Sequence, residues 1–152
     1  MAEAAAGPLA GVRVVELATV VAGPGSGKYL ADYGASVVKV ESPSGDPTRR
    51  MGLTGPAERD SYFWKLLNRN KQVITLDLKS TDGRKSLWAL LADADVLIEN
   101  YRPDVKHRLG IDYETLRKIN PRLVYVSVSG FGQDGPYANR PGFDQVAQLA
   151  KA

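Results

Sequence analysis

Five short apolar runs recur along this chain, and segments with helix signals separate them. Near-continuous apolar runs of this length are typical of strands that are buried on both faces, as in a parallel sheet covered by helices. An amphipathic antiparallel strand would instead alternate apolar and polar residues. The pattern therefore predicts a parallel sheet whose strands cover residues 12–17, 36–41, 73–76, 96–99 and 123–128.

Helix start and stop signals lie between these runs. Pro24 can occupy the first turn of a helix that ends at Gly34, and Ser61 can cap a short helix through Leu67. Further helices are predicted over residues 80–92, 103–109 and 112–119, and residues 42–60 are predicted to form a long polar loop. With right-handed crossovers, the predicted fold class is α/β, with a Rossmann-like, doubly wound, mostly parallel sheet.

The last ten residues, 143–152, read as the first turns of another helix that has no stop signal. Asp144 sits where a helix cap or a partner of the helix dipole is common. We therefore expect the sheet to be truncated at its C-terminus and the chain to be the N-terminal part of a larger protein.

Composition excludes several kinds of site. The chain has no cysteine and a single histidine, His107, so disulfides, cysteine-ligated metals and multi-histidine metal sites are excluded, and no metal is expected. The formal charge is only +3 and no Lys/Arg run exceeds two residues, which argues against a nucleic-acid partner. No apolar run reaches membrane-spanning length and no secretory signal is present, so we expect a cytoplasmic protein with no membrane partner.

A glycine-rich segment, residues 22–28, follows the first predicted strand. It does not match a P-loop, because three residues rather than four separate Gly23 from Gly27 and Tyr29 follows Lys28. It matches a dinucleotide fingerprint only in part, with Glu41 where a ribose-binding acid would lie. The other interpretation is that the glycines allow a tight turn and close packing of the helix on the strand.

Basic residues lie mostly at predicted strand ends and in loops: Lys39, Arg49, Lys71, Lys79, Arg102 and Arg108. Ligands of parallel sheets bind outside the carboxyl ends of the strands. Residues 99–103 follow the fourth strand there and offer an amide, an aromatic ring and a guanidinium, which suit a ligand with a flat ring and phosphates. A solvated loop is the alternative. His107, between two cations, is interpreted as part of a solvated helix face, and Asp46 and Asp77 are assigned no chemistry.

Several segments, in order, resemble the family III CoA-transferases, a superfamily that includes formyl-CoA transferases and α-methylacyl-CoA racemases. The resemblance covers essentially the whole chain. Each motif alone is weak, but the ordered set is specific. It comprises residues 9–17, 21–24, 30–35, 38–41, 45–49, 68–71, 94–103 and 129–148.

The resemblance implies a function. These enzymes move CoA between carboxylic acids through acyl-enzyme intermediates on an aspartate, which attacks the thioester carbonyl as a nucleophile. That aspartate is expected beyond Ala152, so no catalytic residue is assigned here. Residues 1–152 would then be the CoA-binding N-terminal part, and its parent an interlocked homodimer. By position, the resemblance implies these CoA-binding residues: Thr19, Val20, Val21, Leu76, Lys79, Asn100, Tyr101, Arg102 and Arg108.

Two alternatives stay open. Racemases of the superfamily use a histidine in the segment that matches residues 142–144, where this chain has Phe143, and this favours a transferase. The other alternative is a stand-alone, non-catalytic module that binds CoA or another nucleotide. The expected partners are an acyl-CoA and a carboxylic acid.

Overall fold

The computed structural model describes residues 7–55 and 58–142 of the chain. Within them, five strands form one sheet in the order β3-β2-β1-β4-β5, and every neighbouring pair is parallel. The predicted α/β class with a parallel sheet is confirmed. The strands are β1 (Arg13–Glu16), β2 (Ser36–Glu41), β3 (Gln72–Thr75), β4 (Val96–Glu99) and β5 (Val124–Ser127).

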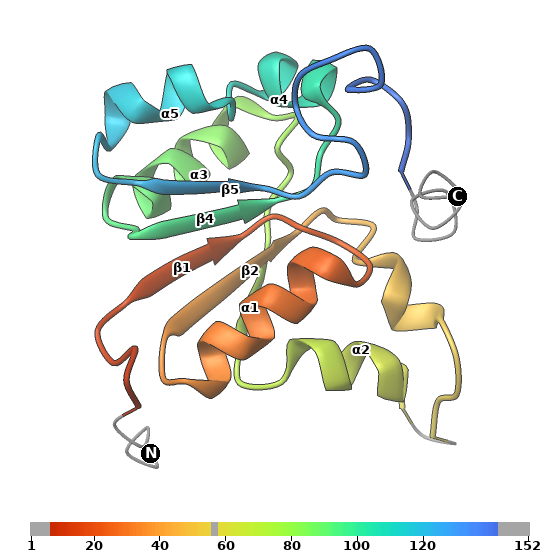
Figure 1. Cartoon of the computed structure of the whole chain (residues 1–152). Coiled ribbons are helices and arrows are strands. Elements are labelled where there is room, and N and C mark those ends of the chain that lie inside the picture. The colour runs from red at the N-terminus through yellow and green to blue at the C-terminus, as the bar shows by residue number, and fades with distance from the viewer. Residues whose placement is uncertain (1–6, 56–57, 143–152) are drawn as a thin grey trace.

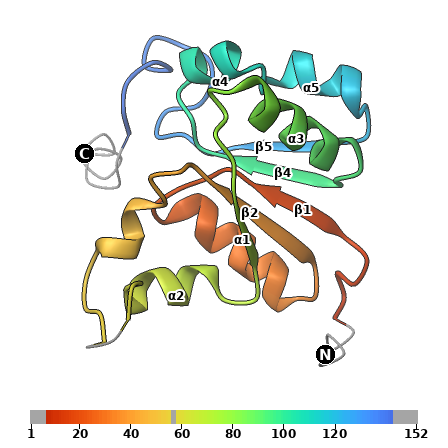
Figure 2. The ribbon, with the colours of Figure 1, turned by 180° about the vertical axis from the view of Figure 1, so that it is seen from behind.

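Helices lie on both faces of this sheet (Figures 1 and 2). One layer holds α1 (Ala22–Asp32) and α2 (Tyr62–Asn68), and the other holds α3 (Thr81–Ala92), α4 (Pro103–Leu109) and α5 (Tyr113–Ile119). The chain goes outward from β1 to β3, then returns to place β4 on the other side of β1. The point between β1 and β4 is therefore a topological switch point, where ligands of open parallel sheets bind.

Short polar side chains start several helices, as the sequence predicts. The side chains of Ser61, Ser80 and Asp112 accept hydrogen bonds from the backbone N–H groups of Trp64, Gly83 and Thr115, respectively. Each bond satisfies an N–H group that would otherwise lack a partner in the first turn.

The predicted loop over residues 42–60 contains one element that the prediction missed. A 3₁₀ helix, η1 (Pro47–Arg50), begins after Asp46, whose side chain accepts from the Thr48 N–H. The predicted helix over residues 143–152 lies outside the described residues.

Alternation along the strands divides the apolar core into two clusters. Val15, Val40 and Leu97 face α3 and α5 and join Leu87 and Leu91 in the larger cluster. Val14, Val37 and Ile98 face α1 and join Ala31 and Ala35 in the smaller one. Both faces of the central strands are thus buried, which explains why these strands read as continuous apolar runs.

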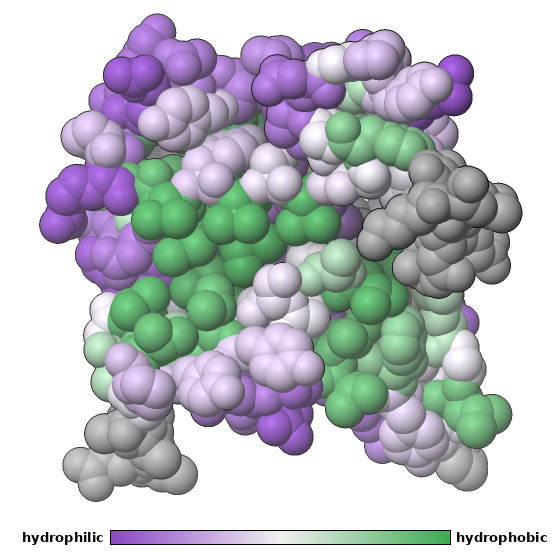
Figure 3. Space-filling view, in the orientation of Figure 1, coloured by the Kyte–Doolittle hydropathy of each residue, from purple (hydrophilic) through white to green (hydrophobic). Residues whose placement is uncertain are grey.

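The face of β5 on the α1 side has no helix over it among the described residues. Val124 and Val126 alternate with Tyr125 on this strand and are 57% and 36% exposed. Figure 3 shows a broad hydrophobic area over β1, β4 and β5, between α1 and α5. No helix in the described part of the chain is long and apolar enough to cross a membrane.

Candidate functional site

A cavity of about 450 Å³ opens at the carboxyl edge of the sheet. The loops after β2, β3 and β4 form its walls, together with one side of α4. Because this edge adjoins the switch point, the cavity lies where the sequence predicted a ligand site. Its lining includes Ser42, Ser44, Asp77, Leu78, Lys79, Tyr101, Val105 and Arg108.

Two cations line this cavity, Lys79 and Arg108. Both are exposed, and among the described residues neither has a carboxylate oxygen within the 4.0 Å of an ion pair. Asp77 also lines the cavity, but one of its oxygens accepts the Lys79 backbone N–H at 3.0 Å. Cations with no carboxylate partner can interact with the phosphates of a ligand.

Tyr101 supplies an aromatic wall. Its ring packs against the larger apolar cluster and is half-buried. Burial raises the pKa of the Tyr101 hydroxyl, and the Glu99 carboxylate adds to the shift, so the phenol is neutral at physiological pH. A flat, uncharged ring beside two cations suits a ligand that combines an aromatic base with phosphates.

The structure places two other predicted residues away from the cavity. Leu76 packs against the larger apolar cluster, and its neighbour Leu78 lines the cavity instead. Arg102 is exposed, and its Nε lies 3.5 Å from the Asp104 carboxylate. The resemblance could not separate these positions, because similarity in sequence does not show which side chains face the cavity.

The remaining predicted residues form a second group beside the cavity. Thr19, Val20 and Val21 make the turn from β1 into α1, and Asn100 follows β4. The Thr19 N–H donates to the Asn100 Oδ1 at 3.0 Å, and the Asn100 Nδ2 donates to the Thr19 carbonyl at 2.9 Å. Val20 has a φ of 69° and Val21 is 48% exposed.

Two predicted edge cations are instead buried beneath α1. Lys39 Nζ lies 3.1 Å from Glu16 and 3.0 Å from Asp46, and all three side chains are fully buried. Lys71 Nζ lies 2.8 Å from the other oxygen of Glu16 and donates to the Pro24 carbonyl at 2.7 Å. The prediction that these lysines face a ligand at the sheet edge is not met, because alternation turns Glu16 and Lys39 toward α1.

Burial and ion pairing shift the pKa values of this buried group in opposite directions. Burial lowers the pKa of Lys71, and Glu16 opposes the shift. Burial would raise the pKa of Asp46, but hydrogen bonds from Thr48 and the charge of Lys39 outweigh it and lower that pKa. Glu16 and Asp46 thus each lie within ion-pair distance of a lysine, although the buried Oδ2 of Asp46 accepts no hydrogen bond from any described residue.

Arg49 and Glu41 are also used within the protein. The Arg49 guanidinium makes two hydrogen bonds to Glu41, at 2.7 and 3.2 Å, and stacks 3.8 Å from the Trp64 ring centre. The Trp64 Nε1 donates to Glu41 as well, at 3.1 Å. Glu41 is therefore not free to bind a ribose, and the partial dinucleotide fingerprint is a wrong interpretation of this acid.

The glycines of residues 22–28 serve helix packing. A Cβ on Gly23 would overlap the Ala18 Cβ, and a Cβ on Gly27 would overlap the Glu16 carboxylate. Gly25, between them, faces open space. Close approach of α1 to the end of β1 thus requires glycine at two positions one helical turn apart.

A buried lysine that no sequence pattern indicated lies behind the cavity. Lys106 of α4 is 6% exposed, and its Nζ donates to Glu99 at 3.1 Å, to Ser127 at 2.9 Å and to Gln133. Its neighbours Val105 and Arg108 line the cavity. The exposed His107 beside it agrees with the predicted solvated helix face.

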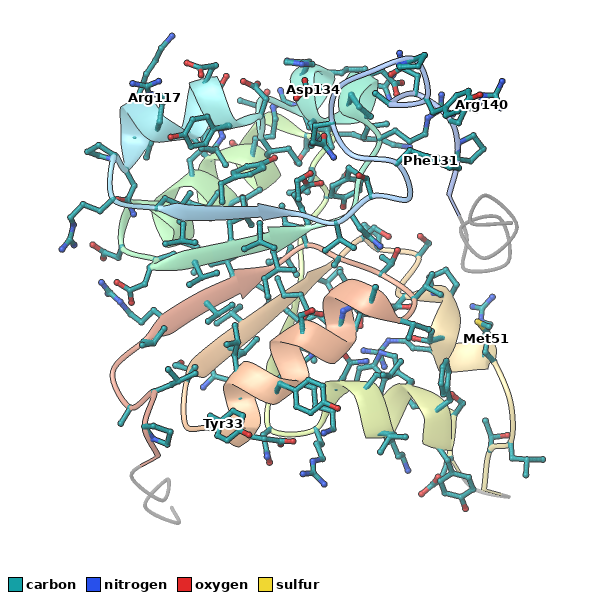
Figure 4. The ribbon with its side chains drawn as sticks, in the orientation of Figure 1. Tyr33, Met51, Arg117, Phe131, Asp134 and Arg140 are labelled. Carbon is teal, nitrogen blue, oxygen red and sulfur yellow. The ribbon has the colours of Figure 1, made fainter. Side chains whose placement is uncertain are left out.

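The loop after β5 flanks the same edge of the sheet. Figure 4 places Phe131 and Arg140 on this loop, on the side toward which the strands point, with Met51 on the same side after η1. The rings of Phe131 and Tyr137 meet edge to face at 5.8 Å, and the Arg140 guanidinium lies 4.3 Å from the Tyr137 ring centre. Among the described residues, no group of three or more His, Asp or Glu side chains could hold a metal ion.

A doubly wound parallel sheet with a cavity at its carboxyl edge defines an α/β protein of the class whose ligands bind at that edge. The chain belongs to the CoA-transferase family III, whose model matches residues 9–151.

Relatives agree with this family in sequence. The chain is 46% identical over 147 residues to a succinate–glutarate CoA-transferase of Agrobacterium fabrum, covering 93% of this chain and 37% of the relative. It is 45% identical over 141 residues to the β subunit of a succinyl-CoA–L-malate CoA-transferase of Chloroflexus aurantiacus, covering 92% of this chain and 35% of the relative. The chain thus spans little more than a third of these relatives' length.

Solved structures agree in fold. The crystal structure of a CaiB/BaiF family protein from Brucella suis superposes with a TM-score of 0.90 at 46% identity, covering 95% of this chain and 39% of that one. A hypothetical protein from Mycobacterium tuberculosis superposes with a TM-score of 0.82 at 38% identity, covering 93% and 38%.

Proposed function

We propose that this chain is the CoA-binding part of a CoA-transferase that moves CoA between carboxylic acids. The observation that carries the proposal is the cavity at the carboxyl edge, where Lys79 and Arg108 lack carboxylate partners among the described residues and Tyr101 offers a neutral ring. Membership in the family supplies the ligand class.

The proposed ligand extends across the switch point. The adenosine and its phosphates occupy the cavity beside Lys79 and Arg108. The pantetheine arm passes Tyr101 and Asn100, and the thioester reaches the turn formed by Thr19, Val20 and Val21. The cavity is large enough for part of such a ligand but not for all of it, so an extended pose agrees with its volume.

The covalent chemistry needs a free carboxylate near the thioester. In the proposed reaction, an aspartate attacks the thioester carbonyl and CoA thiolate leaves, which forms a mixed anhydride. The thiolate then attacks the aspartyl carbonyl of this anhydride, so that the first acid is released and CoA is held on the aspartate as a thioester. The second carboxylate attacks that thioester, and the thiolate released attacks the new anhydride at the acid's carbonyl, which forms the new acyl-CoA and regenerates the aspartate. The buried carboxylates of the described chain, Glu16, Glu41, Asp46 and Glu99, are each held by a lysine or arginine. In line with the family resemblance, we propose that the nucleophile lies beyond Ala152 and that this chain alone transfers no CoA.

Three finer proposals accompany this one. The second substrate is a carboxylic acid, in line with the named reactions of the relatives. The complete enzyme is an interlocked homodimer, and it works in the cytoplasm. A transfer assay tests the second substrate. Gel filtration with light scattering tests the dimer, and cell fractionation tests the location.

Calorimetric titration with CoA tests the binding proposal. Lys79→Ala and Arg108→Ala should each weaken binding about tenfold, the usual effect of losing one charge-assisted contact. The loss should be greater at low salt, because ions screen exposed charges. Lys118→Ala is the matched control, since Lys118 is exposed on α5 and does not line the cavity. Equal affinity in all four proteins would refute the phosphate assignment.

A further inference from the structure

Two loops that are distant in sequence are joined at the switch point by one side chain. The Asn100 carboxamide accepts from the Thr19 N–H at 3.0 Å and donates to the Thr19 carbonyl at 2.9 Å, across 81 residues. A carboxamide has one carbonyl oxygen and one NH₂ group. Both groups are engaged by the backbone of a single residue, so the side chain acts as a clamp on the turn after β1.

The residue next to the clamp has a strained backbone. Val20 has a φ of 69°, in the left-handed region that a β-branched side chain disfavours. The other non-glycine residue with a positive φ in the described part of the chain is Asn70, a type that tolerates this region. Strain of this kind persists where the surrounding structure enforces it, and it is found more often at functional sites.

The turn is also fixed at its other end. Gly23 packs against Ala18 so closely that a Cβ would not fit, and the Gly25 N–H donates to the Val21 carbonyl at 2.7 Å as α1 begins. Thr19 and Gly23 are thus both anchored, and Val20, Val21 and Ala22 connect them. Val21 is exposed at the edge of the sheet, next to the cavity loops.

We propose that Asn100 is a positioning residue, which holds the Thr19–Val21 turn in the strained shape that receives the thioester end of CoA. This inference rests on the proposed function. It assigns Asn100 a role beyond the direct contact that the family resemblance implies, because both polar groups of its carboxamide are bonded to the backbone of Thr19.

The clamp predicts a specific coupling between two substitutions. Asn100→Ala frees Thr19, lets Val20 relax to a negative φ, and should weaken CoA binding about tenfold. Val20→Gly removes the strain, because glycine adopts a positive φ without steric cost. In a protein that already carries Asn100→Ala, Val20→Gly should therefore raise the affinity for CoA about threefold. If the two residues acted independently, the effects of the two substitutions would instead be additive.

The experiment combines calorimetry with CoA and hydrogen exchange of backbone amides in the four proteins of this cycle. Asn120→Ala is the matched control: the Asn120 Nδ2 donates to the Leu91 and Ala94 carbonyls, far from the carboxyl edge, so its loss affects stability without loosening the turn. Asn100→Ala, and not Asn120→Ala, should accelerate exchange of the Thr19 amide.

The two readouts separate this inference from the proposed function. If wild-type protein binds no CoA, the proposed function fails, and exchange of Thr19 still tests the clamp. If CoA binds but the two substitutions are additive, or if Thr19 exchange is unchanged in Asn100→Ala, the clamp is refuted while the binding site stands.

Discussion

Replacing Gly27 with alanine tests whether the glycines of α1 serve packing. The added methyl group would occupy the position of the Glu16 Oε2 atom, which accepts from Lys71 Nζ at 2.8 Å. Glu16 must then move, and both Lys39 and Lys71 lose their shared carboxylate in a site that solvent does not reach. Breaking a buried ion pair costs about 3–5 kcal/mol.

A second effect opposes this loss. Alanine favours a helix over glycine by about 1 kcal/mol. The free energy of unfolding should therefore fall by about 2–4 kcal/mol, which for a domain of this size lowers the Tm by about 5–15 °C. Gly25→Ala is the control, because it makes the same change in the same helix where a Cβ meets nothing within 4 Å. It should raise the free energy of unfolding by about 0.5–1 kcal/mol.

Urea titrations followed by far-UV circular dichroism measure both variants against the wild type. Gly27→Ala should lower the free energy of unfolding and Gly25→Ala should raise it, although the two substitutions are identical and lie two residues apart. If Gly27→Ala were as stable as Gly25→Ala, Gly27 would not be required for packing and the ion pairs of Glu16 would not be broken by the added methyl group.

Three further predictions follow from the described contacts. The pKa of Asp46 is lowered in the folded state, so its contribution to stability is present above the unfolded pKa near 3.8 and is lost as pH falls through the folded value. Asp46→Asn should therefore flatten the acid dependence of the free energy of unfolding, measured by urea titrations. An unchanged pH profile in this variant would contradict the role of Asp46. Lys106→Met removes the ammonium that three acceptors share and leaves Glu99 buried without its cation. The free energy of unfolding should therefore fall by about 3 kcal/mol. A loss below about 1 kcal/mol would refute the stabilising role of Lys106. Val124→Thr with Val126→Thr should reduce binding of a hydrophobic dye to the exposed face of β5, and undiminished fluorescence would place the dye elsewhere.

Much of the fold is predictable because local signals agree with the tertiary structure. Continuous apolar runs mark strands buried on both faces, and Ser61 caps a helix as predicted. The helices predicted over residues 80–92 and 112–119 begin where Ser80 and Asp112 cap them. Strand β2 has the bounds that the sequence predicts. η1 was missed because Pro47 and the Asp46 cap lie in a polar stretch with no apolar periodicity.

The site was less predictable, because the sequence shows which residues are charged but not which residues they pair with. Lys39 and Lys79 both lie near strand ends, but Lys39 is buried against Glu16 and Asp46, while Lys79 faces the cavity. Glu16 precedes Lys39 by more than 20 residues, and only the parallel register of β1 and β2 brings them opposite each other. Lys106 is a similar case, since its acceptors come from β4, β5 and the following loop.

A crystal structure of this chain soaked with CoA tests the central claim most directly. We expect electron density for the adenosine and phosphates beside Lys79 and Arg108, with the pantetheine arm directed toward the Thr19–Val21 turn. Density for CoA at any other place on the molecule, with the cavity free of ligand, would contradict it.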